Sequence, residues 1–184
     1  MTRRGYDGLK ALASLRAKLD AESFLEVMHE GGHLWKAHFT FGPPATREAI
    51  EETKRQLQVP FPTSYEKFLL YCDGALLYYD TECGQWGFQL YGTKDLFSMN
   101  TERRIPYENE WPSHYLIFGA SRGDSDLLVL DTAHQSNEEG YYPVIDGEGG
   151  YSPAEWVVIA PDFGIWLDRL VVAQGAKYWR WYPQ

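Results

Sequence analysis

The chain has 184 residues, a formal net charge of −9 at pH 7, and 44% hydrophobic and 16% aromatic residues. This is the size of one globular domain, and the apolar content excludes an intrinsically disordered chain. The segment from Gly123 to Asp168 contains ten acidic residues and no Lys or Arg, which argues against nucleic acid as a partner and would attract a basic protein; solubility is the alternative explanation of this charge.

The N-terminal sequence does not have the pattern of a signal peptide. Lys10 and Arg16 interrupt the apolar residues that follow Arg3 and Arg4, and no later apolar run reaches the length of a membrane span. The two cysteines of the chain do not form a C-x-x-C pair. We therefore expect a cytoplasmic protein with reduced thiols and no membrane partner.

The first part of the chain is predicted to be helical. Apolar residues recur at helical spacing at Leu9, Leu12, Leu15 and Leu19. After Asp20, a favourable N-cap, the apolar face continues through Phe24, Leu25 and Met28. The pattern predicts one broken helix or two short ones.

The stretch HEGGH, residues 29–33, fits the H-E-x-x-H pattern, in which two histidines on one face of a helix bind zinc. Each of the two intervening glycines costs about 1 kcal/mol relative to Ala inside a helix, and Gly31 favours a left-handed helix end. We therefore interpret HEGGH as a hinge between an N-terminal helical extension, residues 1–38, and a binding domain, residues 39–184. A zinc-dependent hydrolase that uses His29, Glu30 and His33 is the remote alternative.

The rest of the chain predicts an α+β fold. Thr46 caps a helix that ends before Pro60, and Pro62 opens a second helix that ends at Gly74. Short apolar runs separated by turn signals then predict an antiparallel sheet of about six strands, in LLYY, GFQLYG, HYLIFG, DLLVLD, YYPVID and EWVVIA. A C-terminal helix is predicted in APDFGIWLDRLVVAQG. This order of helices, strands and helix is typical of a single α+β domain.

Three further motifs are better explained by a structural role or by surface charge than by catalysis or metal binding. GASRG places Ser121 in a G-x-S-x-G pattern, but the following run alternates like a strand, so a strand–loop–strand connection is expected. The acids Asp124, Asp126 and Asp131 lack the spacing of a calcium loop. The C-terminal KYWRWYP is expected to pack its rings back onto the domain. We predict no metal, no cofactor and no catalytic residue.

Several stretches, read in order, resemble the SUKH superfamily, the Smi- and Knr-like domain of bacterial toxin-immunity proteins and fungal regulators of cell-wall synthesis. The stretches are FGPPATREAIEETKRQLQVPFPTSYEKFLLYCDGA, GFQLYGTKDLFSMN, YLIFGASRGDSDLLVLD and IAPDFGIWLDRL. Together they cover roughly Phe39 to Val172, and Asp73 stands where the family more commonly has Asn. The resemblance implies an α+β domain that binds a protein partner and catalyses no reaction.

The resemblance and the charge together predict an immunity protein that masks a basic toxin, such as a nuclease, through an acidic surface. The residues expected to contact the partner are Asp124, Asp126, Glu138, Glu139, Tyr141, Tyr142, Asp146, Glu148 and Tyr151. A scaffold or regulator of cell-wall synthesis remains the alternative, because the fold alone does not separate the two. The sequence does not indicate the oligomeric state.

Overall fold

The structure is a computed structural model that describes residues 8–107, 109–134 and 141–181. Its α-helices are α1 (Gly8–Arg16), α2 (Arg47–Leu57), α3 (Thr63–Tyr71), α4 (Thr93–Arg103) and α5 (Phe163–Val172). Its strands are β1 (Phe24–Met28), β2 (Leu34–Phe41), β3 (Ala75–Asp80), β4 (Phe88–Leu90), β5 (Tyr115–Ser121), β6 (Leu127–Asp131), β7 (Val144–Gly147) and β8 (Val157–Ala160). Short 3₁₀ turns are η1 (Glu30–Gly32), η2 (Ile105–Tyr107) and η3 (Tyr178–Arg180).

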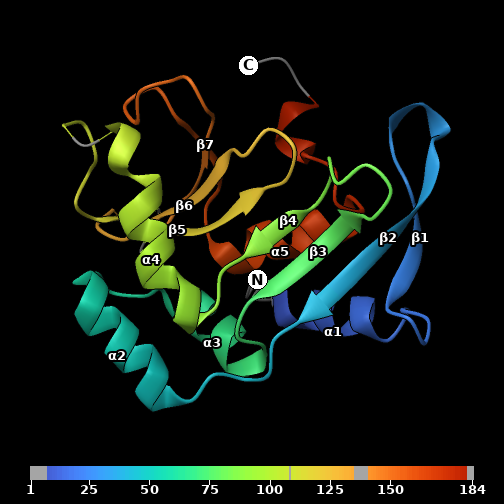
Figure 1. Ribbon diagram of the computed structural model, residues 1–184, viewed down its shortest axis with the longest axis horizontal. Coiled ribbons are helices and arrows are strands. Elements are labelled where there is room, and N and C mark those ends of the chain that lie inside the picture. The colour runs from blue at the N-terminus through green and yellow to red at the C-terminus, as the bar shows by residue number, and fades with distance from the viewer. Residues whose placement is uncertain (1–7, 108, 135–140, 182–184) are drawn as a thin grey trace, which may run out of the picture.

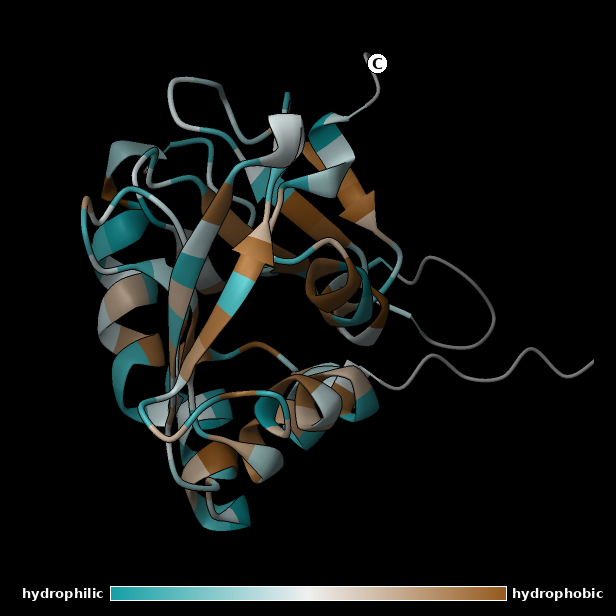
Figure 2. Cartoon of the chain, turned by 90° about the vertical axis from the view of Figure 1, so that its right-hand side faces the viewer, coloured by the Kyte–Doolittle hydropathy of each residue, from teal (hydrophilic) through white to brown (hydrophobic). Residues whose placement is uncertain are grey.

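The strands form one eight-stranded antiparallel sheet in which each strand pairs with the next one along the chain. The helix α1 packs against α5, and α2 packs against α4 (Figure 1). Coloured by hydropathy, α5 and the central strands are largely apolar, while the outer turns of the helices are polar (Figure 2). The predicted α+β class is confirmed, with an N-terminal and a C-terminal helix in contact.

The six strands expected from the sequence are present as β3 to β8, and the expected helices as α2, α3 and α5. The predicted cap of α2 is present, because Thr46 Oγ1 accepts a hydrogen bond of 3.1 Å from Ala49 N. The helix α5 is capped in the same way by Asp162, whose Oδ1 lies 2.7 Å from Gly164 N. Local signals therefore positioned these elements correctly.

The helix predicted over residues 24–28 is wrong, because these residues form β1, which pairs with β2. A short apolar run such as this one fits a helix or a strand equally well. The glycines of HEGGH close the hairpin instead of ending a helix: Gly31 and Gly32 have φ of 73° and 75°, and His29 N donates to His33 O over 2.9 Å. The predicted boundary at residue 38 falls within β2, and β2 also pairs with β3.

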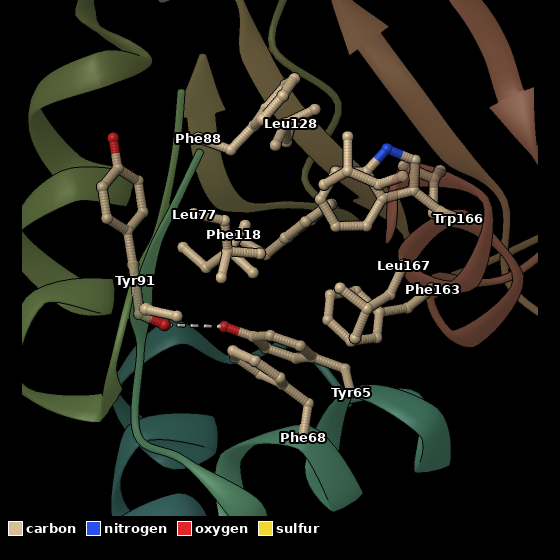
Figure 3. Packing of buried hydrophobic residues seen from close by; sticks show 14 of the residues in the cluster. Tyr65, Phe68, Leu77, Phe88, Tyr91, Phe118, Leu128, Phe163, Trp166 and Leu167 are labelled. Carbon is tan, nitrogen blue, oxygen red and sulfur yellow. Dashed lines mark hydrogen bonds between the residues drawn. The ribbon is translucent and has the colours of Figure 1, made fainter. Parts of the chain in front are cut away.

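Aromatic side chains from α3, α5 and the sheet fill the core (Figure 3). The ring centroids of Tyr65 and Phe163 lie 5.2 Å apart, as do those of Phe118 and Trp166. Each of these four side chains is at most 1% exposed. The hydroxyl of Tyr65 donates to the carbonyl of Tyr91 over 3.2 Å, so the one polar atom of this ring is also satisfied.

The helix α4, which was not predicted, receives its cap from a residue that lies far away in sequence. Asp73 Oδ1 accepts from Thr93 N over 2.6 Å, and Asp73 Oδ2 accepts from Thr93 Oγ1 over 2.7 Å. The turn that ends α3 thus places a carboxylate at the N-terminus of α4, where a negative charge is favoured.

We expect Asp73→Ala to lower the free energy of unfolding by about 1–2 kcal/mol, because it removes this cap. Asp73→Asn retains an acceptor for Thr93 N and should lose less than half as much. Urea denaturation of the two variants and the wild-type protein measures both effects. Equal losses in the two variants would contradict the capping role of the carboxylate.

Candidate functional site

Four of the residues predicted to contact a partner come together at one end of β6 and β7. Asp124 and Asp126 lie in the loop between β5 and β6, Asp146 lies in β7, and Glu148 follows β7. The pairing of Leu128 with Asp146 in the β6–β7 register brings the two loops side by side. We call these four residues the acidic cluster.

The acidic cluster binds two cations from the end of the chain. Lys177 Nζ lies 2.7 Å from Asp124 Oδ2 and 2.6 Å from Asp126 Oδ2. Arg180 lies 2.8 Å from Asp126 Oδ2 and 3.2 Å from Asp146 Oδ2. The C-terminal segment, defined here as Lys177–Arg180, is therefore held against the sheet by ion pairs.

Two aromatic residues of the C-terminal segment, Tyr178 and Trp179, pack onto the domain, as expected from the sequence, whereas Trp181 is 48% exposed and Tyr182 lies outside the described residues. Trp179 Nε1 donates to Asp146 Oδ2 over 2.7 Å, and its ring centroid lies 6.3 Å from that of Phe88. The sequence predicted this packing but not the ion pairs. Lys177 and Arg180 were not predicted to be part of the site, because their acidic partners lie 32 to 54 residues earlier in the chain.

Burial divides the acidic cluster into two pairs. Asp126 and Asp146 are 4% and 3% exposed, whereas Asp124 and Glu148 are exposed. With the C-terminal segment in place, a partner protein reaches only the exposed pair. Because four carboxylates face two cations, the cluster retains an excess of negative charge on its solvent side.

The carboxyl groups of the cluster differ in their pKa values. Burial alone would raise the pKa of Asp124, but hydrogen bonds from Lys177 and Ser121 outweigh burial and lower it. Burial raises the pKa of Asp146 in spite of the nearby cations, and its Oδ1 has no hydrogen-bond partner among the described residues.

These two shifts act on stability in opposite directions. The lowered pKa of Asp124 means that its ionised form stabilises the fold above the usual carboxyl range, and this contribution is lost as the pH falls. The raised pKa of Asp146 gives a contribution that is present at low pH and is lost as the pH rises through the raised pKa. Arg180 is stabilised in its charged form: although burial lowers its pKa, the charges of Asp146 and Asp126 outweigh burial and raise it.

The acidic cluster also shapes the loop between β7 and β8. Asp126 Oδ1 accepts from Gly149 N over 3.1 Å, and Glu148 O accepts from Trp156 Nε1 over 3.1 Å. These bonds fix both ends of the loop that carries Tyr151, whose side chain is 52% exposed. The loop therefore presents an aromatic residue next to the exposed acids.

The other predicted contact residues lie outside this arrangement. Tyr141 and Tyr142 precede β7, are half-buried and take part in contacts of their own. Glu138 and Glu139 lie outside the described residues.

The two enzyme-like motifs do not have the geometry that their chemistry needs. No helix carries His29 and His33, since they lie at the two ends of the β1–β2 turn. The ring of His29 contacts the rings of Trp35 and Trp86, at centroid distances of 5.4 and 5.6 Å. Ser121 ends β5, hydrogen-bonds to Asp124 and leads through a loop to β6, so the predicted strand–loop–strand connection is confirmed.

Within the described parts of the chain, none of the helices has the length and apolar character needed to cross a membrane.

These features define a class: single-domain α+β proteins built on one meandering antiparallel sheet with an acidic surface at one end. The model of the SMI1 / KNR4 family (SUKH-1) matches residues 44–169, and the chain belongs to this family. The resemblance inferred from the sequence is thereby confirmed.

Two relatives come from Bacillus subtilis (strain 168), and both are described as uncharacterized proteins. YnaB is 26% identical over 147 residues, which cover 80% of this chain and 90% of YnaB. YobM is 23% identical over 180 residues, which cover 94% of this chain and 90% of YobM.

Proposed function

We propose that this chain is a non-enzymatic binding protein that neutralises a basic toxin, as an immunity protein. The observation that carries this proposal is the excess negative charge of the acidic cluster beside an exposed tyrosine, in a chain of the SUKH-1 family. Opposite charge on the partner would accelerate association. A nuclease toxin fits, because an acidic surface competes with nucleic acid for the same cationic side chains.

The proposed contact surface consists of the exposed Asp124 in the loop before β6 and of exposed residues after β7. Glu148 and Glu155 supply negative charge, and Tyr151 supplies a large side chain that can enter a pocket on the partner. Aromatic anchors surrounded by a polar rim are typical of strong interfaces. In this arrangement, the buried Asp126 and Asp146 hold the surface in shape, while the exposed residues touch the partner.

The test begins with genes adjacent to the one that encodes this chain. Co-expression with a neighbouring toxin should restore growth, and the purified pair should bind more weakly as salt rises from about 0.1 M to about 1 M, where screening is stronger. Failure to protect against any neighbouring candidate would overturn the immunity proposal. A neighbourhood of cell-wall enzymes without a toxin would support the alternative of a scaffold or regulator.

Surface variants then locate the interface. We expect Tyr151→Ala to weaken binding on the order of 30-fold, as for an interface hot spot. The double variant Glu148→Lys/Glu155→Lys should chiefly slow association. Glu22→Lys is the matched control, because Glu22 is an exposed acid in the turn before β1. Biosensor kinetics measure both rates, and equal effects in the test and control variants would contradict this surface.

A further inference from the structure

A second group of ionisable side chains lies at the other end of β5 and β6. His114 immediately precedes β5, Asp131 is the last residue of β6, and His134 follows three residues later. His114 Nε2 lies 3.6 Å from Asp131 Oδ1, and His134 Nδ1 lies 2.9 Å from Asp131 Oδ2. Over residues 8–107, 109–134 and 141–181, this is the group of three His, Cys, Asp or Glu side chains whose ligand atoms lie within 4.8 Å of one another.

Backbone hydrogen bonds hold the three residues in this arrangement. Thr132 donates to the carbonyl of His114 twice, from N over 3.0 Å and from Oγ1 over 2.7 Å. Ala133 N and His134 N both donate to Asp131 Oδ1, over 3.1 and 3.0 Å. These hydrogen bonds thus hold the turn after β6 against the start of β5, and they fix the orientation of the Asp131 carboxylate. Preorganised ligands of this kind, with hydrogen bonds to the ligating carboxylate, are typical of metal sites.

The chemistry of the group suits a transition metal ion. Two imidazoles and one carboxylate are ligands for zinc and similar first-row divalent ions. Zinc bonds of about 2.1 Å in tetrahedral geometry place neighbouring ligand atoms about 3.4 Å apart. His114 Nε2 and His134 Nδ1 lie 3.6 and 3.2 Å from the same oxygen, Asp131 Oδ1, and the ligand atoms of all three residues lie within 4.8 Å of one another. A bound ion would replace the hydrogen bond of 2.9 Å between His134 Nδ1 and Asp131 Oδ2. No Lys or Arg occurs in the sequence from Gly123 to Asp168 that could supply a competing cation from the same segment.

We propose that His114, Asp131 and His134 bind one divalent transition metal ion of the zinc class, with at least one coordination position left for water. The ion would join the start of β5 to the turn after β6. This site is separate from the HEGGH motif and from the acidic cluster, and it does not depend on the proposed immunity function.

The test uses the full chain without an affinity tag, titrated with zinc chloride and, separately, with cobalt(II) chloride. We expect one ion per chain by calorimetry, and His134→Ala and His114→Ala should each weaken binding by at least about tenfold. Zinc should also raise the Tm of the wild-type protein but not that of His134→Ala. His33→Ala is the matched control, because His33 is an exposed histidine in the β1–β2 turn.

The side chain of His134 is 72% exposed, so its loss should leave the fold intact, which circular dichroism verifies. If His114→Ala fails to fold, His134→Ala decides the outcome alone. Absence of wild-type binding, or wild-type affinity in His134→Ala, would overturn the proposal. Equal losses in His33→Ala and His134→Ala would also overturn it, because they would indicate non-specific histidine binding.

Discussion

Replacing both Lys177 and Arg180 by Met should lower the free energy of unfolding by about 3–5 kcal/mol, because it leaves two buried carboxylates without their cations. Asp126 and Asp146 are 4% and 3% exposed, and Lys177 and Arg180 supply the charges that face them. Each single substitution should have a smaller effect, because Asp126 keeps its other partner. Urea denaturation at neutral pH measures all three variants.

A double-mutant cycle separates the ion pairs from the packing of the C-terminal segment. In the background of Asp126→Asn, Lys177→Met should cost less than in the wild-type chain, since the buried charge is already absent. Arg55→Met is the control: Arg55 pairs with Glu52 on the surface of α2, and such a pair contributes at most about 1 kcal/mol. If the Lys177→Met/Arg180→Met variant were as stable as the Arg55→Met variant, the ion pairs would not be what holds the C-terminal segment against the sheet.

The contact predictions depend on this result. If the ion pairs are strong, Asp126 and Asp146 remain covered when a partner binds, and the interface is limited to the exposed residues around Tyr151. If they are weak, a basic partner segment could replace Lys177 and Arg180, and all four acids would contact it, as the sequence suggested. The stability measurement therefore decides which acids are worth substituting in binding assays.

Elements with local signals were predictable from the sequence. The helix α2 has its cap at Thr46, and the runs that form β5 and β6 are apolar segments bounded by turns. The strand β1 was predicted as a helix because its five residues contain too few positions to distinguish the two periods. The hairpin with β2 resolves the ambiguity, but the pairing involves two segments and does not follow from the apolar pattern of β1 alone.

Neither the helix α4 nor the ion pairs of the acidic cluster with Lys177 and Arg180 were predicted, and the reason is the same for both. The N-terminus of α4 is capped by Asp73, 20 residues away, and Lys177 reaches Asp126 across 51 residues. The acidic composition indicated that these residues form part of a surface, but only the register of β6 and β7 shows which of the acids lie close together. Contacts between distant segments depend on the whole fold, and a single sequence carries little information about them.

A second large loss of stability is expected when Asn100 of α4 is substituted. Its side chain makes the hydrogen bonds to β5 that the backbone of a longer β4 would otherwise make. The short β4 pairs with β5 from Gly119 to Ser121, so it does not reach Ile117. Asn100 completes the bonding there: its Oδ1 accepts from Ile117 N over 2.9 Å, and its Nδ2 donates to Ile117 O over 2.8 Å. Asn100 is 3% exposed and Ile117 is fully buried, so water does not substitute for these bonds.

We expect Asn100→Leu to lower the free energy of unfolding by about 2–5 kcal/mol, because it leaves the buried N–H and C=O of Ile117 unpaired. Asn100→Asp at neutral pH should be at least as damaging, since a carboxylate cannot donate and its charge would be buried. Thr101→Ala, an exposed neighbour on the same helix, should change stability by less than about 0.5 kcal/mol.

Hydrogen exchange at the Ile117 amide gives a local measurement beside urea denaturation. Loss of the Asn100 acceptor should expose this amide to exchange through local opening, at a free energy below that of global unfolding. Unchanged protection of Ile117 in a destabilised Asn100→Leu variant would mean that the loss comes from side-chain packing between α4 and β5. In that case the hydrogen bonds of Asn100 would not be what compensates for the backbone pairing that the three-residue β4 does not provide at Ile117.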